Sequence, residues 1–273
     1  MYKMLFSQLK KISTMKLKLW TLIIAGFGLF NIPAMAQTIY PVTSGEMIFS
    51  QSNASFNQSF INQYPNAKLV ANNVRYTVFF HIGQYIHYDI NNKVGLFSGL
   101  AIRNVGMITD ETLPQTVTST PSSATYSDYK IIRRQYMLGV PLALKVGAFN
   151  NHFYLYGGAE YEMAFHLKEK YWSNTFDRSG SKTKSTQWFS NQTPTFLPSV
   201  FAGVQLPGGI NLKFKYYLTD FLNSDYTTSR NSTEGSSFDI SDLSRYKESQ
   251  VISFSLCWQF NTSAIWEEGE SIW

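Results

Sequence analysis

The feature that most constrains this chain is a strict alternation of apolar and polar side chains over residues 152–170. One set of alternate positions reads Phe153, Leu155, Gly157, Ala159, Tyr161, Met163, Phe165 and Leu167. The other set reads Tyr154, Tyr156, Gly158, Glu160, Glu162, Ala164, His166, Lys168 and Lys170. Successive side chains of a β-strand point to opposite faces, so this pattern predicts a long strand with one apolar face and one charged face.

The same alternation recurs along the chain. It is clear at 132–146, 210–219 and 251–260, and it is looser at 75–90, 94–106 and 196–206. A weaker first strand is predicted within 45–60. The 17 Tyr and 21 Phe residues favour strands over helices. The chain is therefore expected to be all-β.

Short and long connections alternate between these segments. Asn91–Lys93, Asn150–Asn151 and Pro207–Gly209 read as tight turns. The segments 107–128, 173–190 and 223–245 read as long polar loops. Adjacent antiparallel strands place successive connections at opposite ends, so the turns share one rim and the loops share the other. Bacterial outer-membrane barrels have an even number of strands. The seven clearer segments therefore require the weaker first strand within 45–60, which gives about eight strands in total.

The apolar and the charged faces indicate which side meets the solvent. An eight-stranded barrel has an interior that side chains just fill, and bulky aromatic side chains from every strand would overfill it. Small residues and paired charges fit better inside, which leaves the bulky face for lipid. The fold class predicted is a closed antiparallel up-and-down transmembrane β-barrel. A soluble exported barrel with the apolar face inward is the alternative.

The first 36 residues read as a secretory signal peptide. Lys16 and Lys18 precede an apolar run over 19–30, and Ala34-Met35-Ala36 forms a small-residue cleavage pattern. Five lysines and no acidic residue lie in this segment, so 18 of the 23 basic residues remain to match 18 acidic ones. No basic patch is evident to serve nucleic acid. The predicted domains are the signal peptide 1–36, the barrel 37–260 and a periplasmic tail 261–273.

With these residues in view, the chain resembles small outer-membrane β-barrel proteins of the Bacteroidetes type, with an OmpA- or OmpX-like architecture, and it also resembles PorT-like proteins. The resemblance covers about 75–260. The stretches that carry it are 94–106 (VGLFSGLAIRNVG), 134–147 (RQYMLGVPLALKVG), 154–165 (YLYGGAEYEMAF) and 199–217 (SVFAGVQLPGGINLKFKYY). It implies location in the bacterial outer membrane, contact with outer-membrane lipid and, for the PorT-like case, a role in protein export.

The charges predicted to point into the lumen form the main constellation. They are Arg133, Lys145, Glu160, Glu162, His166, Lys168, Lys213 and Lys215. Buried charges must be paired, so mixed signs favour a structural network over an ion path. His81, His87 and Asp89 share one face and have the side chains of a metal or hydrolase site, but a polar core pair is the simpler interpretation. The only cysteine, Cys257, is expected to be a buried packing residue.

We therefore predict a non-enzymatic outer-membrane barrel with a plugged, salt-bridged lumen that displays outer loops for structural or interaction roles. No catalytic, cofactor-binding or metal-binding residue is predicted. One alternative is a barrel component of a secretion or export machinery, with periplasmic or secretion-system partners. Further alternatives are an outer-membrane lipid-modifying enzyme and a soluble lipocalin-like binder.

Overall fold

The computed structural model describes residues 38–71, 73–78, 81–120 and 123–261. The predicted signal peptide and nearly all of the predicted tail lie outside the described residues. No helix in the described ranges is long and apolar enough to cross a membrane.

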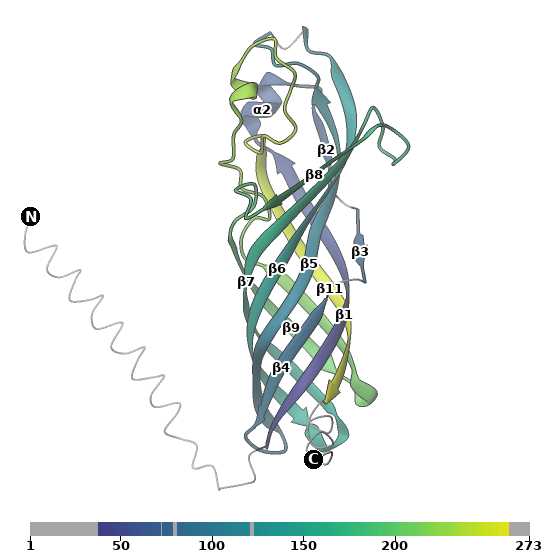
Figure 1. Cartoon of the computed structure of the whole chain (residues 1–273), viewed down its shortest axis with the longest axis vertical. Helices are drawn as coiled ribbons and strands as arrows, with labels where there is room; N and C mark the ends of the chain where they lie inside the picture. The colour runs from purple at the N-terminus through teal and green to yellow at the C-terminus, as the bar shows by residue number, and fades with distance from the viewer. Residues whose placement is uncertain (1–37, 72, 79–80, 121–122, 262–273) are drawn as a thin grey trace, which may run out of the picture. The chain divides into compact units, whose positions relative to one another are not determined.

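The described residues form a closed antiparallel barrel (Figure 1). A ring of eight strands contains β1 (Thr38–Phe56), β4 (Ile82–Asp89), β5 (Val94–Pro114), β6 (Tyr126–Ala148), β7 (Phe153–Ser173), β9 (Phe196–Gln205), β10 (Ile210–Tyr217) and β11 (Tyr246–Asn261). The ring closes because β11 pairs with β1 along most of its length, from Val42 opposite Asn261 to Phe56 opposite Tyr246. The predicted up-and-down barrel of about eight strands is confirmed. The first strand, inferred from parity, runs over 38–56.

Three shorter strands lie beside this ring. β2 (Lys68–Val70) pairs with β5, and β3 (Arg75–Thr77) pairs with β1. Above the end of β4, these two short strands therefore lie between β1 and β5. β8 (Lys182–Trp188) pairs with the upper part of β7 and extends away from the barrel wall (Figure 1). The short helix α2 (Gln58–Gln63) follows β1, and the Asn57 side chain caps it by accepting from the Phe60 N–H at 2.7 Å.

The tight turns all lie at one end of the barrel. Asn91 stabilises the β4–β5 turn because its side-chain oxygen accepts from the N–H groups of Lys93 and Val94. The turns η2 (Phe149–Asn151) and η3 (Pro207–Gly209) join β6 to β7 and β9 to β10. Gly208 and Gly209 both have φ of +82°, a conformation that side chains with a Cβ rarely adopt.

The long connections lie at the other end, and they begin later than the sequence suggests. Half of the predicted loop 107–128 is strand, because β5 continues to Pro114 and β6 starts at Tyr126. The predicted loop 173–190 contains β8. Above the apolar part of the barrel both faces of a strand carry polar residues, so alternation no longer marks the strand and only ladder hydrogen bonds define it.

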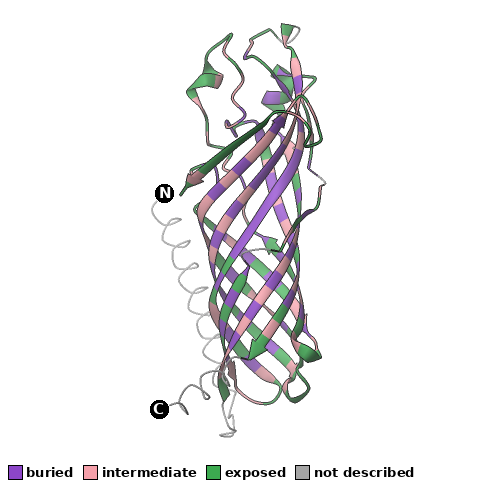
Figure 2. Ribbon diagram, turned by 45° about the vertical axis from the view of Figure 1, so that its right-hand side comes forward, coloured by how far each residue is buried: buried purple, intermediate pink, exposed green. Residues whose placement is uncertain are grey.

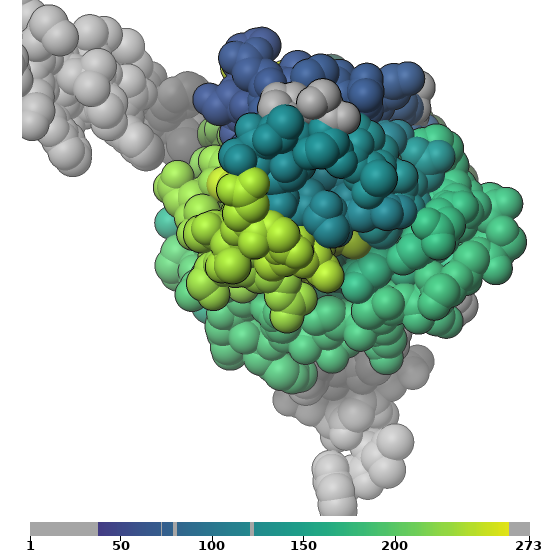
Figure 3. All heavy atoms as spheres, turned by 90° about the horizontal axis from the view of Figure 1, so that it is seen from above, coloured from purple at the N-terminus to yellow at the C-terminus, as the bar shows by residue number. Residues whose placement is uncertain are grey.

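These loops meet over the mouth of the barrel (Figure 3). Residues 115–117 form backbone hydrogen bonds with residues 235–238, including an isolated bridge between Thr116 and Ser237. Phe238 in the β10–β11 connection, which also contains η4 (Ser229–Ser232), contacts the rings of Phe60 and Tyr64. The β1–β4, β5–β6 and β10–β11 connections therefore pack as one layer.

Burial along the lower barrel alternates residue by residue (Figure 2). The exposed set is apolar and includes Ile86, Leu142, Leu155, Phe214 and Phe260. The buried set contains most of the charge and the small polar residues. A water-soluble barrel has the opposite arrangement, with its apolar side chains inside.

Candidate functional site

The barrel interior is filled in layers. Nearest the short turns lies an aromatic layer made of Val42, Tyr85, Phe97, Ala101, Ala143, Tyr154, Tyr156 and Phe201. A group of charged side chains follows, and above it lies an apolar layer that includes Ile48, Val105, Met137, Leu197 and Val251. A second group of charges lies closer to the loops. The buried charged groups are the candidate site, because burying a charge is unfavourable unless the charge is paired.

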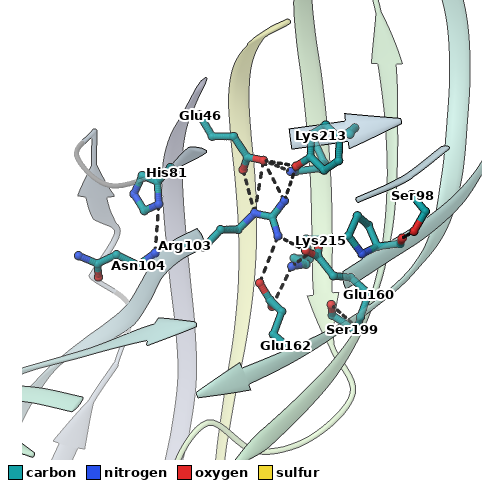
Figure 4. Close-up of polar contacts among 12 residues, drawn as sticks. Glu46, His81, Ser98, Arg103, Asn104, Glu160, Glu162, Ser199, Lys213 and Lys215 are labelled. Carbon is teal, nitrogen blue, oxygen red and sulfur yellow. Dashed lines mark hydrogen bonds and ion pairs between the residues drawn. The ribbon is translucent and has the colours of Figure 1, made fainter. Parts of the chain in front are cut away.

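The central ion cluster comprises Glu46, Arg103, Glu160, Glu162, Lys213 and Lys215 (Figure 4). The Arg103 guanidinium lies among all three carboxylates. It is 3.0 Å from Glu46 and 3.3 Å from Glu162, and it also contacts Glu160. The Tyr85 hydroxyl accepts a further hydrogen bond from Arg103 at 2.9 Å.

The two lysines complete the charge balance of the central ion cluster. Lys213 Nζ lies 2.6 Å from Glu46, whereas Lys215 Nζ lies 2.7 Å from Glu160 and 2.8 Å from Glu162. Three carboxylates therefore meet three cations, and every carboxylate contacts two of them. Such pairing offsets the desolvation of each charge.

Glycine provides the space for this cluster on β6. A Cβ placed on Gly139 would collide with the carboxylate of Glu160 and approach Glu162 Cγ to 2.9 Å. The long side chains of Glu160 and Glu162 thus lie over Gly139, which has no side chain. This packing explains why small residues share the charged face of the strands.

The upper ion cluster comprises Glu111, Arg133, Glu169, Arg245 and Tyr246. Arg133 lies 2.6 Å from Glu169 and 3.7 Å from Glu111, and Arg245 lies 3.1 Å from Glu111. The Tyr246 hydroxyl accepts from Arg133 at 2.8 Å and donates to Glu111. Two carboxylates and two guanidinium groups again balance.

Lys145 lies near the short turns, apart from both clusters. Its ammonium pairs with Asp89 and lies 2.8 Å from the Tyr40 hydroxyl and 3.1 Å from His87 Nδ1. His87 also stacks on Phe97, with ring centroids 4.9 Å apart. His87 and Asp89 therefore belong to the surroundings of one lysine.

His81 lies elsewhere, beside the gap between β3 and β4. Its Nδ1 accepts from the Asn104 N–H at 3.1 Å (Figure 4). Arg75 donates to the Asn104 carbonyl oxygen at 3.1 Å. These two side chains replace the ladder partners that an uninterrupted strand would offer to β5. His81 is thus part of the barrel wall. No three His, Cys, Asp or Glu residues in the described ranges are arranged to hold a metal ion.

Two of the predicted lumen residues lie on the outer face instead. Phe165 is an extra residue in β7, because Tyr136 pairs with His166 while Met137 pairs with Ala164. This bulge reverses the alternation, so Leu167 and Glu169 become buried and His166 and Lys168 turn outward. The prediction that His166 and Lys168 point into the lumen was wrong for this reason.

The structure places the other six inside the barrel, in three different groups. Glu160, Glu162, Lys213 and Lys215 meet in the central ion cluster, Arg133 lies in the upper ion cluster, and Lys145 stands near the turns. Cys257 is buried.

Sequence reasoning missed half of the charges that matter. Glu46 and Arg103 lie in strands whose inward face mixes charge with apolar residues, so their alternation is weak. Glu111 and Arg245 fall in segments predicted as loops, and Glu169 falls on the wrong face because of the bulge. A lone charge within an apolar stretch, such as Glu46 or Arg103, is the signal that could have found the first two.

The space beside the central ion cluster is small. The cavity lined by Glu46, Arg103, Glu160 and Lys213 has a volume of about 10 Å³. A single water molecule needs about that much. The side chains of the central ion cluster therefore neutralise one another around a space about the size of one water molecule.

Comparisons with known proteins give structural similarity only. No family model and no curated protein matches this chain. Solved structures that are similar include Ail, the attachment invasion locus protein of Yersinia pestis (TM-score 0.31, 11% identity, covering 81% of this chain and 99% of that chain). Neisserial surface protein A, NspA, has a TM-score of 0.35 and 11% identity, covering 83% and 99%. The outer membrane protein OprG from Pseudomonas aeruginosa has a TM-score of 0.31 and 11% identity, covering 82% and 96%.

Proposed function

We propose that this chain is a non-enzymatic β-barrel of the bacterial outer membrane, which holds a layer of surface loops on a closed support. The observation that carries the proposal is the inverted distribution of polarity. Charged side chains are buried inside the barrel, whereas large apolar side chains surround its lower half. Exposed apolar surface of this extent is unfavourable in water and matches the apolar band of a membrane barrel.

The height of the apolar band supports this proposal. On β6 the outward apolar residues run from Tyr136 to Val146, and along β10 and the residue after it they run from Ile210 to Leu218. A strand of about ten residues is enough to cross a bilayer when it is tilted. The long strands β5, β6 and β7 extend past this band, so the upper ion cluster and the loops would project beyond the membrane.

The layered interior supports a plugged lumen. Aromatic, ionic and apolar layers follow one another between the turns and the loops, and the ionic layers are internally neutral. Eight strands enclose a space that side chains just fill. We infer that the charges serve the stability of the barrel and leave no continuous aqueous path.

The loops support an interaction role. The β5–β6 and β10–β11 connections are joined by backbone hydrogen bonds, and α2 packs against them through aromatic rings. Residues that bind partners are often carried on loops above a rigid framework. In this orientation the long loops face the cell exterior and the short turns face the periplasm.

The test is membrane fractionation of the expressed protein, followed by gel electrophoresis of boiled and unboiled samples. We expect recovery with the outer-membrane fraction and faster migration of the unboiled sample, because a closed barrel resists unfolding by detergent. A protein recovered in the soluble periplasmic fraction, with the same mobility before and after boiling, would overturn the proposal.

A further inference from the structure

The outer face of the β6–β7–β8 sheet carries a basic patch, defined here by Arg134, Lys168, Lys170, Lys182 and Lys184. The register places these residues together. Arg134 lies directly opposite Lys168 across β6 and β7, and Lys170 lies directly opposite Lys184 across β7 and β8. Lys182 lies opposite Trp172 on the same face. The bulge at Phe165 turns Lys168 and Lys170 outward and so creates this patch.

No carboxylate neutralises the basic patch. In the part of the chain that the structure describes, none of the five side chains forms an ion pair or a side-chain hydrogen bond. The neighbouring carboxylates pair with other cations. Asp110 lies 2.7 Å from Lys130, and Glu169 points into the barrel toward Arg133. The charges inside the barrel, by contrast, are closely paired.

Two like-charged pairs face each other within the patch, which is unfavourable in a sheet. Partial burial and the neighbouring cations Lys184 and Arg134 lower the pKa of Lys168. Partial burial, followed by Arg134, Lys168, Lys182 and Lys184, lowers the pKa of Lys170. An anion bound at this face would relieve the repulsion and favour the charged form of both lysines.

The height of the patch on the barrel indicates which anion it meets. Directly below lie aromatic rings: Trp188 stacks on Phe165 with ring centroids 6.0 Å apart, and the His166 ring is tilted against Trp188 with centroids 4.7 Å apart. Tyr161 stacks on Phe196 at 5.1 Å below them. From the turns toward the loops, β7 thus passes an apolar band, an aromatic belt and the basic patch. This order matches the hydrocarbon core, the interface and the headgroup layer of a membrane.

We propose that the basic patch binds the phosphate groups of a phosphorylated glycolipid in the outer leaflet that surrounds the barrel. The inference rests on the membrane orientation given under the proposed function and adds a lipid site to it. Several lysines and one arginine on a single face attract phosphate strongly near a membrane surface. The lipid would contact the outer wall of the barrel and the β7–β8 hairpin rather than the interior.

The experiment uses the full chain, refolded in a zwitterionic detergent, and native mass spectrometry to count bound lipid. The probes are phosphorylated lipid A and the same lipid after removal of its phosphates. The patch variant is Lys168→Gln/Lys170→Gln/Lys184→Gln. The matched control, Lys68→Gln/Lys93→Gln/Lys247→Gln, removes three exposed lysines from other parts of the surface.

We expect the unaltered chain and the control to bind phosphorylated lipid A, and the patch variant to bind it about a hundredfold more weakly, since each surface lysine contributes roughly fivefold. The dephosphorylated lipid should bind weakly to all three. Equal affinity of the patch variant and the control, or equal affinity for both lipids, would overturn the proposal. Binding of a soluble sulfated polysaccharide to the patch in preference to lipid A would also overturn it.

Folding is checked in every sample by heat-dependent gel mobility. A second variant, Lys182→Gln/Lys184→Gln, alters only β8, which lies outside the eight-stranded ring. A chain that fails the mobility and fractionation tests refutes the proposed function. A chain that passes them and shows no phosphate-dependent binding refutes only the lipid site.

Discussion

Arg103 lies among three buried carboxylates, and no other cation of the central ion cluster contacts all of them. Arg103 matters for stability because its removal would leave a buried carboxylate without a compensating positive charge. Glu46 would keep Lys213, and Glu160 and Glu162 would share Lys215, so three negative charges would face two positive ones. An uncompensated charge in a closed interior is costly, whereas a well-packed apolar replacement of a whole ion pair is often tolerated.

Replacing Arg103 alone should therefore destabilise the barrel strongly. We expect Arg103→Leu to lower the free energy of unfolding by about 3–5 kcal/mol. The measurement is urea unfolding of the refolded protein, followed by tryptophan fluorescence and gel mobility. Lys247→Leu, at an exposed position on β11, serves as the control and should change stability little. Equal stability of the two variants would contradict a structural role for the central ion cluster.

Gly139 offers a steric test of the same cluster. Gly139→Val should displace the carboxylates of Glu160 and Glu162 and destabilise the barrel by about 1–3 kcal/mol or more. Gly45→Val is the matched control, because a Cβ at Gly45 meets no atom within 4 Å. The comparison again uses urea unfolding. A Gly139 variant as stable as the Gly45 variant would show that the carboxylates move freely.

Lys168 and Lys170 lead to a prediction about pH. Burial and neighbouring cations lower the pKa of both lysines, so each loses its proton at a lower pH than an ordinary lysine with a pKa of 10.5. Phosphate stays ionised over this range. Binding of phosphorylated lipid A should therefore weaken as pH rises, and it should weaken earlier for the unaltered chain than for a Lys168→Arg/Lys170→Arg variant. Native mass spectrometry at a series of pH values measures this, and identical profiles would contradict it.

The strands show how one inserted residue changes the chemistry of both barrel surfaces. Before Phe165 the even-numbered residues of β7 point inward, and after it the odd-numbered ones do. The same bulge therefore brings Glu169 to Arg133 inside and Lys168 to Arg134 outside. A strand without the bulge would bury two unpaired lysines and expose Leu167.

Cysteine labelling tests this reversal directly. In a Cys257→Ser background we expect Lys168→Cys to react readily with a membrane-impermeant maleimide in the folded protein, and Leu167→Cys to react only after denaturation. The physical reason is that a thiol must be accessible and ionised to react. Fast labelling at position 167 together with slow labelling at 168 would place the bulge elsewhere.

The plugged lumen that we propose would be closed by several layers of side chains and loops. The loops cover the mouth, the upper ion cluster and the apolar layer fill the space below them, and the central ion cluster lies below that. Steady ion conduction would need all of them to open together.

We therefore expect no steady conductance when the purified protein is inserted into planar lipid bilayers. The result should be the same for a variant in which residues 224–239 are replaced by a short glycine–serine linker, because the ionic layers remain. Single-channel recording measures this. Stable open channels in the unaltered chain would refute the plugged lumen, and channels only in the shortened variant would show that the loops alone close the barrel.

Sequence reasoning reached the barrel because lipid imposes a local rule. Each outward residue of 136–146 or 210–218 faces lipid and is apolar whatever its neighbours are, so alternation records the fold one residue at a time. Strand count and the two classes of connection followed from the same rule. Arg133, Lys145, Glu160, Glu162, Lys213 and Lys215 could be assigned to the interior on this basis.

Tertiary structure decided what alternation cannot encode. The bulge at Phe165 depends on the register of β6 against β7, so the sequence placed His166 and Lys168 on the wrong face. The carboxylate partners of Arg103 on β5 come from β1 and β7, which meet across the lumen only when the barrel closes. Above the apolar band no lipid constrains either face, so Glu111 and Arg245 looked like loop residues. The alternation along one strand shows which of its faces meets lipid and which meets the lumen. The pairing of charges across the lumen depends instead on the curvature and closure of the ring.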